Sequence, residues 1–329
     1  MRLAAALAAL FLAAAPMVRA ECTGQNVIDA MTPQDRVALH LRAHAVPYAQ
    51  GNFWKATRDG RTVHLIGTYH LDDPRHAQTM EKVEPVIAKA RTVLVEAGPD
   101  EEKALMQRMA RDPSVMLITN GPTLIDLLPP EEWSELAEAL RQREIPPFMA
   151  AKFRPWYLTV VLSVPPCGMK GVANARGLDG MVIDAARRDK VPVKALEPYD
   201  TVFRIFDQMT DEDQLSMVRS TLATEDRSAD FSKTLADSYF AQDSRLTWEL
   251  MRDLSLELPG YTPEKVAGEF ERMEEALMNS RNRGWIPVIE ANAARGPVVA
   301  AFGALHLSGE EGVLNLLARR GWRLERLDL

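Results

Sequence analysis

Short apolar runs rich in β-branched residues lie near both ends of the chain, and apolar residues at helical spacing fill its middle. Residues 52–58 and 61–67 have the pattern of two strands. Asp59 and Gly60 join them, and an Asp-Gly pair between strand-like runs favours a tight hairpin turn. Further apolar runs predict strands over residues 92–95, 191–196, 297–302 and 322–327.

Helical periodicity separates these strands. It predicts a helix over residues 74–90, in which Pro85 is expected to kink or split the helix. A strand, a helix and a strand in this order favour a parallel crossover. The other segments of helical pattern are residues 100–168, 180–188, 309–319 and most of 199–293. We therefore predict an α/β fold: a mixed, largely parallel sheet built from both chain ends, with a large helical insertion over about residues 100–295.

Methionines are frequent in this insertion. A cofactor-binding group is the less favoured interpretation, because unbranched methionine is a common filler of irregular core space. We expect these residues to line the core or a cleft: Met209, Met217, Met251, Met273 and Met278.

The first twenty residues have the features of a secretory signal peptide. Arg2 provides a positive start, residues 3–17 are apolar, and Val18 and Ala20 are compact residues at the −3 and −1 positions of a cut after Ala20. A retained anchor is the alternative, but the run is shorter than the roughly 20 residues that a membrane span needs. We expect a single domain over residues 21–329, periplasmic or secreted, without a later membrane span.

The charge and the cysteines narrow the function classes. The chain has 39 Lys and Arg against 46 Asp and Glu, a net charge of −7; without Arg2 and Arg19 the balance is 37 − 46 = −9. This sign gives no support to a nucleic-acid-binding function. Cys22 and Cys167 are the two cysteines, and an even count in an exported chain favours one disulfide, with two free thiols as the alternative.

Two strand ends carry the same motif. Gly67-Thr68-Tyr69-His70-Leu71 and Gly303-Ala304-Leu305-His306-Leu307 each follow an apolar strand and precede a predicted helix. A single histidine at a strand end is more often a packing residue. Its repetition in one context, in a chain of six histidines, favours a functional pair. The remaining histidines lack the motif, and we interpret them as surface or local structural residues: His40, His44, His64 and His76.

Two acidic residues close other strands. Glu96 follows residues 92–95, and Glu197 follows residues 191–196, where capping of the next helix is the alternative role. Side chains after the carboxyl ends of parallel strands converge on one crevice. Nitrogen and oxygen ligands suit a divalent transition metal such as zinc, manganese, cobalt or iron. We expect His70, His306, Glu96 and Glu197 as metal ligands, with Glu96 acting either as ligand or as general base.

Arg281 and Asn282 precede Gly284, where the pattern predicts that a long helix ends. Cations favour the carboxyl end of a helix, which is one explanation of Arg281. The alternative is that Arg281 or Asn282 steadies the negative charge that develops on a substrate oxygen. Signatures of serine hydrolases, of HExxH zinc proteases and of phosphate-binding loops are missing from the sequence.

These residues, taken as an ordered set, resemble the TraB/GumN family. The set comprises Gly67 to His70, Val95-Glu96-Ala97, Gly177-Leu178-Asp179, Leu196-Glu197, Arg281-Asn282 and Gly303 to Leu307 with Gly309 and Gly312. The resemblance covers roughly residues 50–329. The family includes the Tiki proteins, metal-dependent proteases that use two Gly-x-x-His motifs and a glutamate. The resemblance therefore implies that His70, His306 and Glu96 are the metal-binding and catalytic residues.

The expected function is that of an exported metal-dependent hydrolase acting on a peptide or protein substrate. Two alternatives use the same residues differently. The first is a non-catalytic binding protein that sequesters a peptide, haem or metal. The second is a structural export partner with a vestigial site. A fold alone does not decide between such functions.

Overall fold

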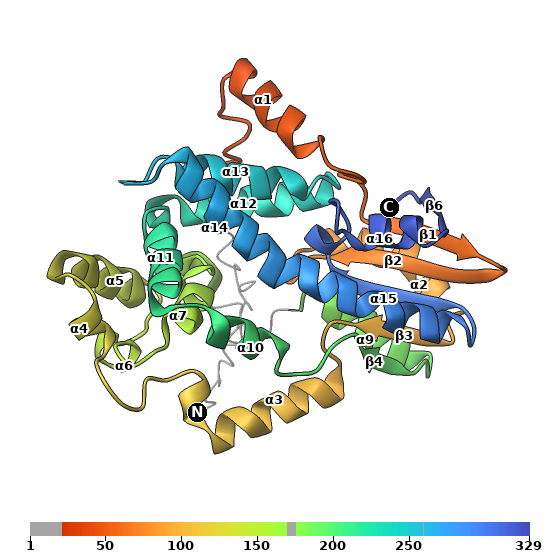
Figure 1. The fold of residues 1–329 in the computed structure, drawn as a ribbon, viewed down its shortest axis with the longest axis horizontal. Helices are drawn as coiled ribbons and strands as arrows, with labels where there is room; N and C mark the ends of the chain where they lie inside the picture. The colour runs from red at the N-terminus through yellow and green to blue at the C-terminus, as the bar shows by residue number, and fades with distance from the viewer. Residues whose placement is uncertain (1–21, 170–175, 259) are drawn as a thin grey trace, which may run out of the picture.

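One mixed sheet organises the molecule (Figure 1). The computed structural model describes residues 22–169, 176–258 and 260–329. The strand order is β4-β3-β5-β2-β1-β6, with β2, β5, β3 and β4 parallel and β1 antiparallel to both of its neighbours. The strands are β1 Phe53–Arg58, β2 Arg61–Thr68, β3 Thr92–Val95, β4 Val193–Ala195, β5 Val298–Gly303 and β6 Arg323–Arg326.

The predicted hairpin is confirmed. Strands β1 and β2 pair antiparallel, with Arg58 opposite Arg61. Asp59 and Gly60 between them have φ angles of 51° and 75°. Positive φ at both turn residues matches the right-handed twist of the two strands, and Asp-Gly adopts it at little cost. The first and last parts of the chain meet here, because β6 pairs with β1.

Helices cover both faces of the sheet. Helices α2 (His76–Ile87) and α9 (Leu178–Arg188) pack on one face, toward which the side chains of Val299 and Ala301 of β5 point. Helices α15 (Ser280–Ala293) and α16 (Val313–Arg319) pack on the other, against Ala300 and Phe302. The alternation along β5 therefore buries both of its faces, as expected for a central parallel strand. Pro85 lies within α2 without splitting it.

Most helices of the insertion lie to the left of the sheet in Figure 1, and α1 lies above them. The insertion's own core gathers leucines from α4, α5, α7 and α11, among them Leu136, Leu158 and Leu215. The prediction of an α/β fold with a helical insertion is confirmed. The remaining described helices are α1 Pro33–Ala43, α3 Pro99–Arg111, α4 Leu124–Leu127, α5 Pro130–Gln142, α6 Pro147–Ala150, α7 Pro155–Leu162, α10 Thr201–Gln208, α11 Asp211–Leu222, α12 Ser228–Phe240, α13 Arg245–Ser255 and α14 Pro263–Glu274.

A disulfide joins the start of the described chain to the insertion. Cys22 and Cys167 are bonded across 145 positions of sequence, as predicted. Such bonds are typical of proteins from oxidising compartments. The predicted signal peptide, residues 1–20, lies outside the described residues. Among the residues that are described, no helix combines the length and the apolar character needed to cross a bilayer.

Candidate active site

Four parallel strand ends meet at one edge of the sheet. The order β4-β3-β5-β2 makes these four strands consecutive neighbours. Glu197, Glu96, His306 and His70 follow them in the same order. We expect distant parts of the chain to bring these residues to one edge, because parallel strands end on the same side of a sheet. The four strands are paired in parallel, so their carboxyl ends do share one edge.

His70 is oriented by an aspartate of the neighbouring helix. Its Nδ1 lies 2.7 Å from Oδ2 of Asp179 in the first turn of α9, and Thr68 donates a hydrogen bond of 2.5 Å to the other oxygen. A carboxylate only accepts, so Nδ1 carries the proton and Nε2 points elsewhere. Desolvation lowers the pKa of His70, but the hydrogen bond and charge of Asp179 outweigh it and raise the pKa to about 9. At pH 7 the metal-free imidazole therefore carries a proton on Nε2 as well, and a metal ion would have to displace that proton to bind there.

Close backbone contact makes this pairing possible. The Leu178 N–H donates to the Tyr69 carbonyl at 2.9 Å. A side chain at Gly177 would place its Cβ 2.3 Å from the His70 carbonyl oxygen, which only glycine avoids. Gly177 therefore sets the distance between the end of β2 and the start of α9.

His306 is buried and held by an amide. Its Nδ1 lies 2.6 Å from Oδ1 of Asn282, whose Nδ2 donates to the Glu311 carbonyl at 2.9 Å. The amide orientation makes Oδ1 the acceptor, so the histidine proton sits on Nδ1 and Nε2 is free to accept. The Trp285 ring packs on His306 with centroids 4.5 Å apart. Burial lowers the pKa of His306 to about 3, so the imidazole is neutral at pH 7.

Glu96 is an ionised carboxylate in the same crevice. The Gly303 N–H donates to its Oε1 at 2.6 Å, and Nη2 of Arg281 donates to its Oε2 at 2.6 Å. Burial alone would raise the pKa of Glu96, but the charges facing it, that of Arg281 among them, hold the pKa down to about 2. The carboxylate is therefore ready to accept a proton or a cation.

Arg281 connects the acidic and imidazole groups. Its Nε donates to both oxygens of Glu197 at 3.1 and 3.0 Å, and its Nη1 approaches Nε2 of His306 at 3.2 Å. Trp285 donates to Glu197 as well, at 2.8 Å. Both oxygens of Glu197 are thus engaged by hydrogen-bond donors.

The prediction that a helix ends before Gly284 is wrong. A continuous helix runs from α14 through a π-helical turn, Glu275–Asn279, into α15, which contains Gly284 and Pro287. Burial of Trp285 and Ile289 against the sheet outweighs the roughly 1 kcal/mol that an interior glycine costs. Arg281 therefore lies in the first turn of α15, and its position is not explained by a helix carboxyl end.

The two Gly-x-x-His motifs converge at Gly303. A Cβ there would lie 3.2 Å from Nε2 of His70, 3.4 Å from Oε1 of Glu96 and 3.6 Å from Cδ2 of His306. The absence of a side chain at Gly303 leaves room for these three groups, although their ligand atoms do not all lie within 4.8 Å of one another. Both imidazoles are held through Nδ1 by an oxygen, an arrangement that is usual for histidines that bind metal through Nε2.

The donor set fits a divalent transition metal in its chemistry: two imidazoles and one ionised carboxylate. The Arg281 guanidinium contacts Glu96 and His306, and it must withdraw from Nε2 of His306 before that nitrogen can ligate. Among the described residues, a different group gathers three ligand atoms within 4.8 Å of one another, namely His40, His44 and Asp243. This second group could hold a metal ion; its histidines are partly exposed, and their interpretation as surface or local structural residues stays a prediction.

A cavity of about 630 Å³ adjoins the crevice. Leu71 and Ser280, the chain neighbours of His70 and Arg281, line it, as does Leu277, whose carbonyl accepts a hydrogen bond from Arg281. Four of the five predicted methionines, Met209, Met217, Met251 and Met273, line it as well. Met278 is buried in a core cluster instead. The prediction of core or cleft positions for these residues is confirmed.

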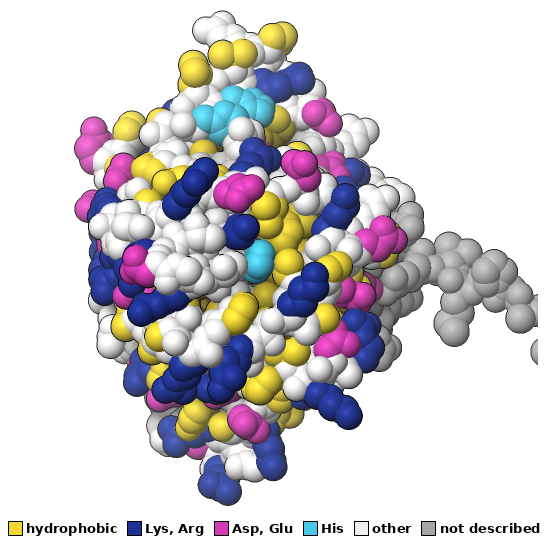
Figure 2. Space-filling model, turned by 90° about the vertical axis from the view of Figure 1, so that its right-hand side faces the viewer, with side chains coloured by type: hydrophobic (Ala, Val, Ile, Leu, Met, Phe, Trp, Pro, Cys, Tyr) yellow, Lys and Arg dark blue, Asp and Glu magenta, His cyan; other side chains and the backbone are white. Residues whose placement is uncertain are grey.

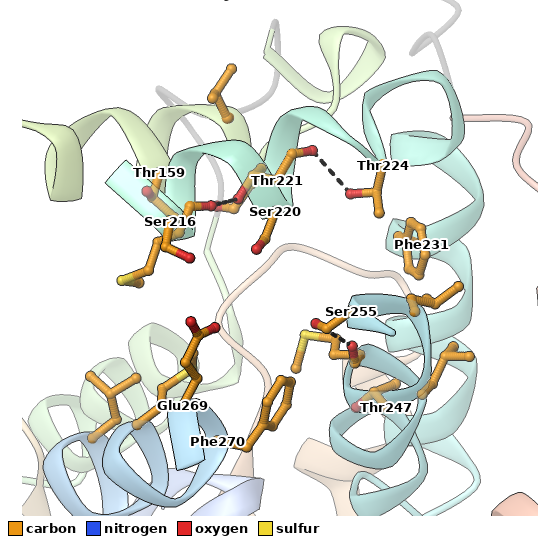
Figure 3. Close-up of a pocket in the computed structure, with 18 of the residues that line it drawn as sticks. Thr159, Ser216, Ser220, Thr221, Thr224, Phe231, Thr247, Ser255, Glu269 and Phe270 are labelled. Atoms are coloured by element: carbon orange, nitrogen blue, oxygen red, sulfur yellow. Dashed lines mark hydrogen bonds between the residues drawn. The ribbon is translucent and has the colours of Figure 1, made fainter. Parts of the chain in front are cut away.

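Many hydroxyl groups line this cavity; several of them donate to carbonyls of their own helix (Figure 3), whereas Ser216 bonds the Tyr261 hydroxyl. Thr221 donates to the Met217 carbonyl at 2.9 Å, and Ser255 donates to the Met251 carbonyl at 2.9 Å. Thr159, Thr247 and Ser280 bond backbone carbonyls in the same way. The lining therefore offers mainly methyl, methylene and thioether surface to a ligand.

Two residues of the crevice had no role in the sequence analysis. Asp179 has a recognisable signal, because an acid two residues after Gly177 begins a predicted helix. Trp285 has none, since its contact with His306 depends on the passage of α15 across the sheet.

The comparisons with known proteins agree with the motif pattern. No curated protein matches the chain at a significant level. The sequence model of the TraB/PrgY/gumN family matches residues 52–326, which include both Gly-x-x-His motifs, Glu96, Glu197 and Arg281. That match covers most of the chain, and the protein therefore belongs to the TraB/PrgY/gumN family.

Proposed function

We propose that this protein is a metal-dependent hydrolase with peptides as substrates. The observation that carries the proposal is that Nε2 of His70, Oε1 of Glu96 and Cδ2 of His306 lie within 3.6 Å of the position that a Cβ on Gly303 would occupy, with Nδ1 of each imidazole held by an oxygen. Family membership supports the same reading. The chain's residues would bind the metal, orient the substrate and handle the proton.

The metal belongs to the group zinc, manganese, cobalt and iron. His70, His306 and Glu96 are the ligands we propose first. When bound, such a metal would supply Lewis-acid chemistry that lets water ionise near neutral pH. The prediction that Glu197 is also a ligand stays a prediction; its contacts with Arg281 and Trp285 equally suit a residue that holds Arg281 in place.

The remaining groups have separate roles. Glu96, ionised at neutral pH, either ligates or accepts the proton of the attacking water. Arg281 is the cation nearest to both Glu96 and His306, so it would stabilise negative charge on the substrate oxygen. Asn282 has both ends of its amide engaged and is buried, so we assign it the positioning of His306.

The adjoining cavity supports a peptide with apolar side chains. Several of its hydroxyls donate to helix carbonyls, and Leu71, Met209, Met217 and Leu277 give it apolar surface beside the charged side chains of Asp213, Glu269 and Arg272. A ligand with a large apolar group would bury that surface, at about 25 cal/mol for each Å² removed from water.

The same cavity favours one second candidate, a binding protein that retains a peptide or haem without turning it over. Its volume of about 630 Å³ is that of a typical small-molecule site. The disulfide and the apolar start of the sequence support a periplasmic or secreted location for either function.

The test combines metal analysis with hydrolysis of a peptide library containing large apolar residues. We expect the wild-type chain to bind metal and to cleave a subset of these peptides. His70→Ala and His306→Ala should lose that activity, whereas His64→Gln, a change on strand β2 away from the crevice, should keep it. Stoichiometric peptide or haem binding without any product would favour the second candidate. Equal metal content and equal activity in all three variants would remove the hydrolase proposal.

A further inference from the structure

Three metal-binding side chains meet where α1 contacts the helical insertion. His40 and His44 lie one turn apart on α1, so both rings project from one side of the helix. Nε2 of His44 is 2.7 Å and Nδ1 of His40 is 4.0 Å from Oδ2 of Asp243. Figure 2 shows histidine side chains gathered at the surface near the top of the molecule, where α1 lies in Figure 1.

Asp243 is a buried acid, and one of its two carboxylate oxygens has no hydrogen-bond partner. Its residue exposure is 4%. Oδ2 accepts from His44 and from Nε2 of Gln50 at 2.9 Å, but Oδ1 is buried and has no hydrogen-bond partner. A carboxylate oxygen buried without a partner is costly and calls for an explanation, and a bound cation is a common one.

We propose that His40, His44 and Asp243 form a zinc site distinct from the crevice. Two imidazole nitrogens and one carboxylate oxygen are ligands that zinc accepts at about 2.0–2.2 Å. The three candidate ligand atoms already lie within 4.8 Å of one another, so small side-chain rotations bring them to one ion. The side chains of His40 and His44 are 39% and 34% exposed, which leaves the solvent side open for water as the fourth ligand.

An ordinary ion pair between His44 and Asp243 explains less of this arrangement. It accounts for the 2.7 Å contact, but it gives His40 no reason to turn its Nδ1 toward the same oxygen. It also leaves Oδ1 of Asp243 without a partner. A zinc ion would engage all three side chains and neutralise the buried carboxylate.

The site would attach α1 to the turn between α12 and α13. Helix α1 also packs Leu39 and Ala43 in one apolar cluster with leucines of α13, and Arg42 pairs with Asp253. Metal ligation would add a cross-link to this small interface. His40 and His44 lie outside residues 52–326, the part that the family shares, so the site would be a feature of this chain and not of the family motif.

Zinc titration of the purified full-length mature chain tests the site. The variant His70→Ala/His306→Ala isolates it from the crevice, so failure here is distinguishable from failure of the proposed function. In that background we expect one zinc ion per chain, and a Tm that rises by about 5 °C at a hundredfold excess over the dissociation constant. Adding His40→Ala should weaken zinc binding by about tenfold or more and reduce the zinc-dependent rise by about half or more at the same zinc concentration.

His64→Gln in the same background is the matched control, because it removes an imidazole that belongs to neither site. It should leave zinc affinity unchanged. His40 is half-exposed, so its replacement keeps the fold and the test does not depend on the buried Asp243; Asp243→Asn serves as a second variant. Zinc affinity that is the same with and without His40, or no zinc bound in the His70→Ala/His306→Ala background, would overturn the proposal.

Discussion

Oδ1 of Asn282 accepts the Nδ1 proton of His306 at 2.6 Å, and this bond connects α15 to the end of β5. The amide cannot turn over, because its Nδ2 donates to the Glu311 carbonyl. The bond therefore fixes both the tautomer and the direction of the imidazole. Partners of this kind control how a histidine presents its other nitrogen to a metal or substrate.

Replacing Asn282 should impair the site without unfolding the chain. We expect Asn282→Ala to lower metal affinity and kcat by roughly 10- to 100-fold, because the His306 ring loses its orienting acceptor. Asn282→Asp keeps the acceptor for His306 but loses the donor to the Glu311 carbonyl, so it should retain more of the affinity than the alanine variant but less than the wild-type chain. Metal titration and kinetics of both variants check this. An alanine variant as active as the aspartate variant would show that the bond has no positioning role.

Gly303→Ala should block the convergence of the crevice groups. The added Cβ would lie 3.2 Å from Nε2 of His70 and 3.4 Å from Oε1 of Glu96, so these groups must move apart by a few tenths of an ångström. Gly303 has φ −48° and ψ 133°, which alanine adopts freely, so the effect is steric and local. We expect activity to fall by about 10- to 100-fold with the Tm nearly unchanged.

Gly284→Ala is the matched control for this substitution. A Cβ at Gly284 meets nothing within 4 Å, and the residue lies inside α15. Alanine there should keep activity and add about 1 kcal/mol to the free energy of unfolding. If Gly303→Ala and Gly284→Ala were equally active, the crevice above Gly303 would not be the reacting centre.

The disulfide should contribute strongly to stability. Cys22 and Cys167 close a loop with a sequence separation of 145, which restricts the unfolded chain considerably. We expect the double variant Cys22→Ser/Cys167→Ser to lose roughly 3–5 kcal/mol of unfolding free energy, measured by urea denaturation. Reduction of the wild-type chain should give the same loss. A reduced protein as stable as the oxidised one would contradict the assignment.

Glu290 should make stability depend on pH. Burial raises the pKa of this carboxyl, but the hydrogen bond from Trp322 and the charges of Arg320 and Arg58 outweigh it and lower the pKa below 4.5. A lowered folded-state pKa gives stability that is present above 4.5 and is lost as the pH falls through the folded-state value.

Glu290→Gln should therefore cost about 1 kcal/mol at pH 7 and progressively less below pH 4.5. Denaturation midpoints of the wild-type and variant chains, measured from pH 3 to pH 7, check this. A difference that stays constant over that range would mean that the charge of Glu290 does not stabilise the fold.

The sequence predicts which residues lie together in the candidate site largely because residues that follow parallel strands lie at the same edge of the sheet. Once β2, β3, β4 and β5 are parallel, the residues that follow them must share an edge. The parallel direction of these strands is sufficient to predict that His70, Glu96 and His306 lie near one another. The hairpin was equally predictable, since Asp59 and Gly60 encode their turn locally.

Contacts that depend on how the helices pack could not be predicted from the sequence pattern. Gly284 signals a helix end locally, but the burial of Trp285 keeps α15 intact and so decides where Arg281 lies. The pairing of His306 with Asn282 depends on the same packing. His40 and His44 carry a local signal, the i and i+4 spacing on a helix, whereas the participation of Asp243 depends on tertiary contacts alone.

Anomalous diffraction from crystals of the mature chain grown with zinc or manganese tests the central claim most directly. The account predicts a peak within ligand distance of Nε2 of His70, Nε2 of His306 and a Glu96 oxygen, with the Arg281 guanidinium moved away from His306. No metal peak among His70, Glu96 and His306, with Arg281 keeping its contacts to Glu96 and His306, would contradict it, whether or not zinc occupies the group of His40, His44 and Asp243.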